Sequence, residues 1–312
     1  MTASRVNRAA MSDSTPSIRP PPMPADYALL FGLAALWGGS FTFIKMGVET
    51  VPAVTMTLMR LVIAVGVMLA LARWQGERLP RGSRIWGAIL VTAITGNALP
   101  FSLIGWGEER IDSGLAAILM GVMPLTTMLI AHVMTADDRL TPGKIAGIVL
   151  GFIGLVILIG PSRLTGLGGE VMRELAVAAA AFCYGINANV TRSLNGVPRM
   201  AAIASVMLVS ALLLLPVSLI VDQPWTIAPS ARSLLAIVAL GIFQTALGTV
   251  ILFTLVRRQG ASFFSQINFL VPISGVLWGA VVLGERPGLT AYLALGIILM
   301  GVAIARWGAR RG

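Results

Sequence analysis

The sequence predicts an all-helical membrane protein in which ten transmembrane helices form two inverted five-helix repeats around a central cavity. The first observation is composition: 56% of the 312 residues are apolar and only 12% are charged, against about 25% charged in a soluble domain. The second is an internal duplication. Trp37 recurs as Tyr184 and Pro124 recurs as Pro272, at offsets of 147 and 148 positions. A lipid bilayer is therefore the expected solvent for most of the chain.

Ten apolar segments have approximately the length that a helix needs to cross a bilayer, about 20 residues. Short connections rich in Gly, Pro and charged residues separate them, as is typical between helices. The segments expected to span the membrane are 27–48, 52–73, 85–106, 113–134, 143–160, 173–192, 199–221, 233–256, 262–283 and 288–306.

The duplication assigns five spans to each copy, over residues 27–160 and 173–306. Five is an odd number, so the second copy must enter the membrane from the opposite side to the first. The two copies are then related by a pseudo-two-fold axis in the membrane plane. Duplicated halves of this kind build many secondary transporters, with the solute site between the copies.

The distribution of basic residues predicts the orientation. With a cytoplasmic N-terminus, 16 of the 23 Lys and Arg residues fall on the inner side and five on the outer side, as the positive-inside rule requires. We therefore expect both termini in the cytoplasm and the protein in the inner or plasma membrane. Residues 1–26 are rich in Pro and Ser, which predicts a disordered tail and not a signal peptide. Residues 307–312 form a short C-terminal tail.

Several functions are disfavoured by what the sequence lacks. Cys183 is the only cysteine, so no intrachain disulfide can form. The net charge of +10 comes from basic residues scattered over short loops, which does not favour nucleic acid as a partner. His132 is the only histidine, and no metal-binding or hydrolase motif is present. We therefore expect no enzymatic activity, metal or cofactor.

Polar and aromatic residues inside the spans are the candidates for lining a solute path, because each one costs free energy in lipid unless it is paired or hydrated. In the first span, Trp37 and Phe41 form one helical stripe beside Ser40, and the repeat aligns that stripe with Tyr184 and Asn187. Amides recur near Pro or Gly in the third, eighth and ninth spans. The predicted cavity residues are Trp37, Ser40, Phe41, Asn97, Tyr184, Asn187, Gln244 and Gln266. On an ideal helix Asn268 points away from Gln266, so at most one of the two faces the path.

Arg60 lies about 12 Å into the second span. It could attract a solute carboxylate, or it could act as a structural lock on helix-end carbonyls or on Glu49, and we favour the lock. We expect Lys45 to extend to the membrane interface. No Asp or Glu lies deep in any span, since Glu108 and Glu285 sit at span ends or in loops. That absence predicts facilitated or only weakly coupled transport.

Two further stripes are expected to serve packing. Met120 and Met123 more plausibly fill the core than bind a solute. Gly143, Gly147 and Gly151 form a ridge of small residues that allows close helix contact. We expect this ridge to pack internally, and a homodimer seam is the alternative.

The stretch Leu36-Trp37-Gly38-Gly39-Ser40-Phe41, followed by Lys45, Pro52 and Arg60, resembles the opening of EamA-type members of the drug/metabolite transporter superfamily. Residues 113–160 and 262–305 resemble a second family motif, present twice. The resemblance covers about residues 27–306 and implies ten helices, a central cavity and export of amino acids or other small metabolites. The second copy departs from the first, since Tyr184 replaces Trp37 and no arginine matches Arg60.

Residues and resemblance together predict an exporter of small metabolites that works by alternating access. An aromatic and amide lining favours neutral or aromatic amino acids as the solute. The alternative is a lipid or glycolipid flippase of the same fold, which would need a lateral opening to lipid. The lipid bilayer and a small molecule are the expected partners.

Overall fold

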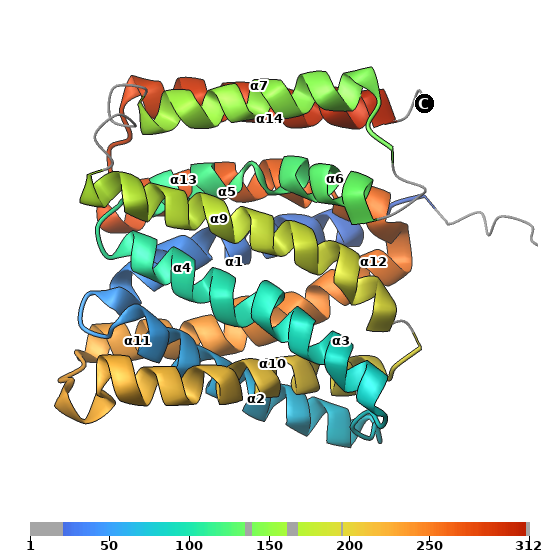
Figure 1. Ribbon diagram of the computed structural model, residues 1–312, viewed down its shortest axis with the longest axis vertical. Helices are drawn as coiled ribbons and strands as arrows, with labels where there is room; N and C mark the ends of the chain where they lie inside the picture. Colours follow the sequence, from blue (N-terminus) through green and yellow to red (C-terminus); the bar gives the residue numbers. More distant parts are fainter. Residues whose placement is uncertain (1–20, 135–138, 161–167, 195, 310–312) are drawn as a thin grey trace, which may run out of the picture.

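The computed structural model describes residues 21–134, 139–160, 168–194 and 196–309, which contain helices and no strand. The first copy comprises α1 (Pro24–Val48), α2 (Ala53–Trp74), α3 (Ser83–Ala93), η1 (Ile94–Ala98), α4 (Leu99–Glu108), α5 (Ser113–Met120), α6 (Met123–Met134) and α7 (Pro142–Ile159). The second comprises α9 (Gly169–Val190), η2 (Thr191–Leu194), α10 (Arg199–Val217), η3 (Ser218–Asp222), η4 (Pro224–Thr226), α11 (Ala231–Ala239), η5 (Leu240–Leu247), α12 (Gly248–Phe264), α13 (Ile267–Leu283) and α14 (Leu289–Ala309). Figure 1 shows them as a bundle of roughly aligned helices.

Eight helical segments of the described chain are long and apolar enough to cross a membrane. The structure therefore supports an all-helical membrane protein, while the predicted count of ten spans is met only in part. α13 has 17 residues, and α9, although 22 residues long, is less apolar than the eight. These two helices occupy the places of the other two predicted spans.

The first helix begins earlier than the sequence indicates. The predicted tail reaches residue 26, of which residues 1–20 lie outside the described chain, but α1 already starts at Pro24. The Asp26 carboxylate accepts a hydrogen bond from the Met23 backbone N–H at 3.0 Å. This contact satisfies one of the free N–H groups at the helix start. At the other end of the chain, α14 continues to Ala309, beyond the predicted limit of 306.

π-helical segments interrupt the third and eighth spans at corresponding places. η1 covers Ile94–Ala98 and η5 covers Leu240–Leu247, about 148 positions further on. Pro100 follows η1 and has no backbone N–H to donate, so the regular hydrogen-bond ladder cannot continue through it. π-helical turns are frequent at functional sites because they redirect side chains and release carbonyls.

The two copies are inverted relative to each other. α7 and α14, which are corresponding helices, lie side by side (Figure 1). Gly143 lies against Gly308 near the start of α7, while Gly154 lies against Ile298 and Ala294 nearer its end, so the two helices are antiparallel. Other contacts recur with the copies exchanged: α1 packs on α13, and its counterpart α9 packs on α5 and α6.

The glycine ridge on α7 packs inside the molecule, as expected, against α14. A Cβ on Gly301 would lie 2.6 Å from the Gly147 carbonyl oxygen and 2.7 Å from the Gly151 backbone nitrogen. We therefore expect Gly301→Val to lower the melting temperature of the purified protein by several degrees or to abolish folding. Gly296→Val on the same helix is the matched control, because Gly296 is exposed and a Cβ there meets nothing within 4 Å. Equal melting temperatures for the two variants would contradict this packing.

The bundle is closed at one end and open at the other. α4 packs against α1 and α2, whereas its counterpart α12, within the described chain, makes no comparable contact with α9 or α10. The symmetry between the copies is therefore broken in packing. We call the end where α4 meets α2 the closed end, and the end with the α9–α10 connection the open end.

Candidate functional site

A cavity of about 680 Å³ lies between the two copies. It reaches the open end at Gly196, Arg199 and Val256, and its floor includes Ile104 on α4. Sites for small ligands typically occupy about 300–1,000 Å³ and are mostly apolar with a few polar groups. The cavity is therefore large enough for a small solute and is reachable from one side of the bundle.

Eight residues that the sequence singles out lie on the wall of this cavity: Trp37, Ser40, Phe41, Arg60, Asn97, Tyr184, Asn187 and Gln244. Gln266 does not, and this placement is a correction. Its side chain is exposed, and Asn268 lines the cavity in its place. The chain leaves the helix at Ser265–Gln266 before α13 begins at Ile267, so a helical phase counted through Gln266 is not valid.

The sequence also missed part of the wall. Met120 and Met123 pack in a hydrophobic core cluster, as expected, but they also line the cavity, as does Pro124. The cause is a break at Gly121-Val122, which separates α5 from α6. The proline and the paired methionines were the available signal, since a proline within a span often marks such a break.

Trp37 joins the two copies. Its indole Nε1 donates a hydrogen bond to the Gln244 backbone oxygen at 3.1 Å. Gly248 permits this approach, because a Cβ there would lie 2.7 Å from Nε1. Gln244 lies within η5, so this hydrogen bond joins α1 of the first copy to the π-helical segment of the second.

The amides of Asn97 and Asn187 come from the third and sixth spans. Asn97 Nδ2 donates to Ser210 Oγ on α10 at 3.3 Å. Gly96 faces Asn187, and a Cβ on this glycine would lie 2.8 Å from the Asn187 side chain. The two amides therefore enter the same wall from opposite copies.

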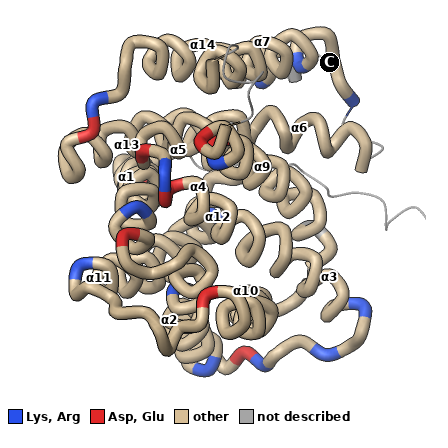
Figure 2. Tube along the Cα trace, turned by 60° about the vertical axis from the view of Figure 1, so that its left-hand side comes forward, with Lys and Arg blue, Asp and Glu red and all other residues tan. Residues whose placement is uncertain are grey.

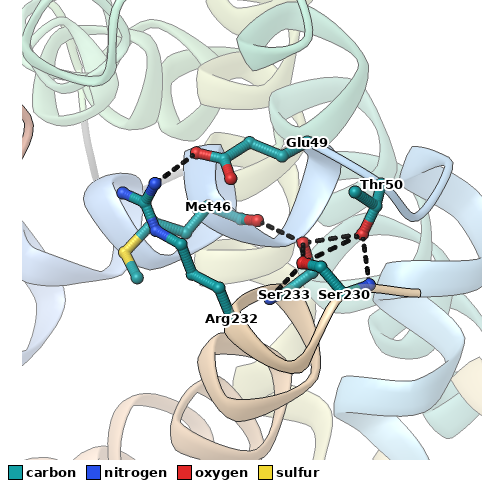
Figure 3. Close-up of polar contacts among 6 residues, drawn as sticks. All are labelled: Met46, Glu49, Thr50, Ser230, Arg232 and Ser233. Carbon is teal, nitrogen blue, oxygen red and sulfur yellow. Dashed lines mark hydrogen bonds and ion pairs between the residues drawn. The ribbon is translucent and has the colours of Figure 1, made fainter.

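Arg60 does not contact Glu49, which is a correction to one of the two partners expected for a lock. Its Nε donates to Thr245 Oγ1 at 2.7 Å, and its guanidinium carbon lies 3.9 Å from the Phe101 ring centroid. Glu49 instead forms an exposed ion pair with Arg232 at 3.4 Å. Figure 3 shows this pair beside the hydrogen bond that joins Thr50 to Ser233.

Lys45 turns into the protein instead of extending to the interface. Its ammonium donates to the backbone oxygens of Glu108 at 2.7 Å and Ile111 at 2.8 Å. It therefore caps the C-terminal end of α4, where free carbonyls favour a positive charge. This contact ties α1 to α4 at the closed end.

Glu108 lies at a helix end, as predicted, yet it is buried inside the protein, which the sequence did not indicate. Its side chain is 0% exposed, and its carboxylate oxygens have no hydrogen-bond partner in the described chain. It ends α4, but the packing of the closed end places that helix end inside the protein. Facilitated or weakly coupled transport, inferred from the absence of acids deep in the spans, stays a prediction, and Glu108 is a buried acid that it did not take into account.

Glu285 closes the same end from the second copy. Its two oxygens accept hydrogen bonds from the backbone N–H groups of Ser113 and Gly114, each at 2.8 Å. Charge-assisted bonds of this kind are about twice as strong as neutral ones. Burial raises the pKa of the neighbouring Asp112 carboxyl, and the charge of Glu285 raises it further.

Charged residues gather at the ends of the helices and in the connections, while long helical stretches carry none (Figure 2). Long apolar helices, two inverted copies and a cavity between them with a few polar groups in its wall are the features of a secondary transporter. The EamA-like transporter family matches residues 26–160 and 172–307. The chain belongs to this family.

Relatives agree with this assignment. The chain is 25% identical over 284 residues to the "Uncharacterized inner membrane transporter YedA" of Escherichia coli K12, covering 90% of each chain. It is also 25% identical over 295 residues to a "Probable amino-acid metabolite efflux pump" of the same organism, covering 91% of this chain and 96% of that one. A solved crystal structure shares the fold, with a TM-score of 0.64 and 21% identity over 92% of this chain and 99% of that one. The protein is a membrane transporter, and the names do not fix its solute.

Proposed function

We propose that this protein exports small metabolites, with neutral or aromatic amino acids favoured, across the inner membrane by alternating access of one cavity. The observation that carries the proposal is the cavity between inverted copies, open at one end and packed at the other. Because the copies are inverted, exchanging their packing would close the open end and open the closed one.

The orientation of the bundle follows from the basic residues. Arg199 begins α10 and Arg257 lies in the C-terminal half of α12, both at the open end, and the positive-inside rule assigns this end to the cytoplasm. The structure then corresponds to the state that receives a solute from the cytoplasm. Both termini lie on that side in this orientation.

The side chains of the cavity wall indicate the class of solute. Amides at Asn97, Asn187 and Gln244 can exchange hydrogen bonds with a polar head group, while Trp37 and Phe41 offer apolar contact. The efflux-pump relative carries a name of the same class. A volume of about 680 Å³ suits a single amino acid with some water.

The test is export from cells that overexpress the protein and are preloaded with single amino acids. We expect faster efflux of some neutral or aromatic amino acids than from vector controls, and several-fold slower efflux from cells carrying Asn97→Ala at equal membrane abundance. A fluorescent phospholipid assay in proteoliposomes forms the second arm. Lipid movement without amino-acid efflux would replace the proposal with the flippase alternative.

A further inference from the structure

One cation in the cavity wall lacks a paired anion. Arg60 is 5% exposed and lines the cavity. Apart from its bond to Thr245 and its contact with the Phe101 ring, the guanidinium has no partner in the described chain, and no carboxylate comes within ion-pair distance. A hydroxyl and an aromatic ring offset only part of the cost of removing this charge from water.

The nearest acid does not provide the pairing. Glu108 interacts with Arg60 electrostatically, but it lies beyond Ile104 toward the closed end and is absent from the cavity wall. Among the described residues of that wall, the charged ones are Arg60 and Arg199, and neither Asp nor Glu occurs. Low-dielectric walls of one sign concentrate the field inside a cleft. The cavity therefore favours a negative group and disfavours a cation.

The surroundings of Arg60 hold the guanidinium ready for such a group. The Phe101 ring supports one face, and the bond from Nε to Thr245 fixes the rotation of the plane. The two Nη groups have no acceptor within the described residues. A planar guanidinium fork matches a carboxylate in a way that an ammonium does not.

Arg60 has no cationic counterpart in the second copy. The position of the second copy that corresponds to Arg60 is Leu208, 148 residues further on. A solute carboxylate in the interior of the cavity would therefore meet Arg60 on the α2 side, while Arg199 lies at the opening. That asymmetry would orient the solute, with its apolar part free to contact the remaining wall.

We propose that Arg60 binds the carboxylate of the transported solute, so that the cavity selects carboxylates over their amide analogues. This inference rests on the proposed function, because it names the group that the same cavity recognises.

The experiment measures binding separately from transport. Purified wild-type protein is titrated with L-phenylalanine, 3-phenylpropionate and the neutral amide 3-phenylpropionamide, and ligand-induced thermal stabilisation gives each affinity. We expect the two acids to bind roughly tenfold or more tightly than the amide. Arg60→Gln should remove that preference by weakening the acids and leaving the amide unchanged. Arg60→Lys, which keeps the charge without the fork, should retain part of the preference and guards against loss through misfolding.

Arg173→Gln is the matched control. Arg173 also lies 3.9 Å from an aromatic ring, that of Trp106, but it pairs with Glu109 outside the cavity. In Arg173→Gln, the ratio of the affinity for the acids to the affinity for the amide should equal that of the wild-type protein. A wild-type protein that does not distinguish acids from the amide, or an Arg60→Gln variant that keeps the preference, would overturn the inference. Failure of the proposed function would look different, since carboxylate binding would persist in a protein that exports no solute.

Discussion

Ser40→Trp is expected to abolish most export while leaving the protein folded. Ser40 is small, lies partly open on the cavity wall, and neighbours Trp37 and Phe41 on the same helix. An indole at this position would fill part of the cavity that the solute occupies. It would extend into open space, so the backbone would not have to move. We expect initial efflux rates to fall by roughly tenfold or more, because the solute would meet a steric clash.

Phe31→Trp is the matched control for Ser40→Trp. It lies on the same helix, nine residues away, and its side chain is 56% exposed on the outer surface of the bundle. Nine residues of an α-helix turn through about 900°, which places the two positions on opposite faces. Efflux should stay near the wild-type rate. Unchanged efflux in Ser40→Trp would mean that the solute does not pass through this cavity.

Glu285→Gln is expected to open the closed end. The substitution keeps the size of the side chain but removes the charge that accepts the N–H groups of Ser113 and Gly114. Hydrogen bonds to charged groups contribute about 1.5–3 kcal/mol each, so the equilibrium should shift by roughly tenfold or more toward the open form. Ile111, which is 4% exposed at this end, reports the change when it is replaced by cysteine.

The measurement is the rate at which a membrane-impermeant maleimide labels Ile111→Cys in a Cys183→Ser background. Glu285→Gln should raise that rate, and Glu49→Gln should leave it nearly unchanged. Glu49 pairs with Arg232 where both side chains are substantially exposed, and exposed ion pairs contribute about 0–1 kcal/mol. Equal labelling rates in the two variants would exclude Glu285 as a closure of this end.

The sequence was sufficient for the repeat and for most of the candidate wall, since hydropathy and a constant offset depend on composition and order alone. Trp37 and Tyr184 could be aligned because the duplication preserves spacing. Gln266 could not be placed, since an ideal helix was assumed through a turn at Ser265–Gln266. At most one of Gln266 and Asn268 was expected to face the cavity, and Asn268 alone lines it, although the ideal helix behind that expectation does not run through Gln266.

The spacing of residues along the sequence could not predict contacts between helices that are distant in the chain. Depth along a span gives no information on which helix lies opposite, so Lys45 was expected at the interface although it caps α4. The burial of Glu108 has the same origin, because it depends on closure by the opposite copy. The difference between the open and closed ends also arises from packing. It could not be predicted from the repeat, which aligns the two copies residue by residue and does not show how each is packed.

The central claim is that one cavity between inverted copies is reached from one end at a time. Distances between spin labels test it most directly, in a Cys183→Ser background. One pair joins Thr50 and Arg110 at the closed end, and its near-counterpart joins Pro198 and Arg257 at the open end. When an exported amino acid is added, the account predicts a second population in which the first distance lengthens while the second shortens. If both distances change in the same direction, or if only one end ever moves, the account is contradicted.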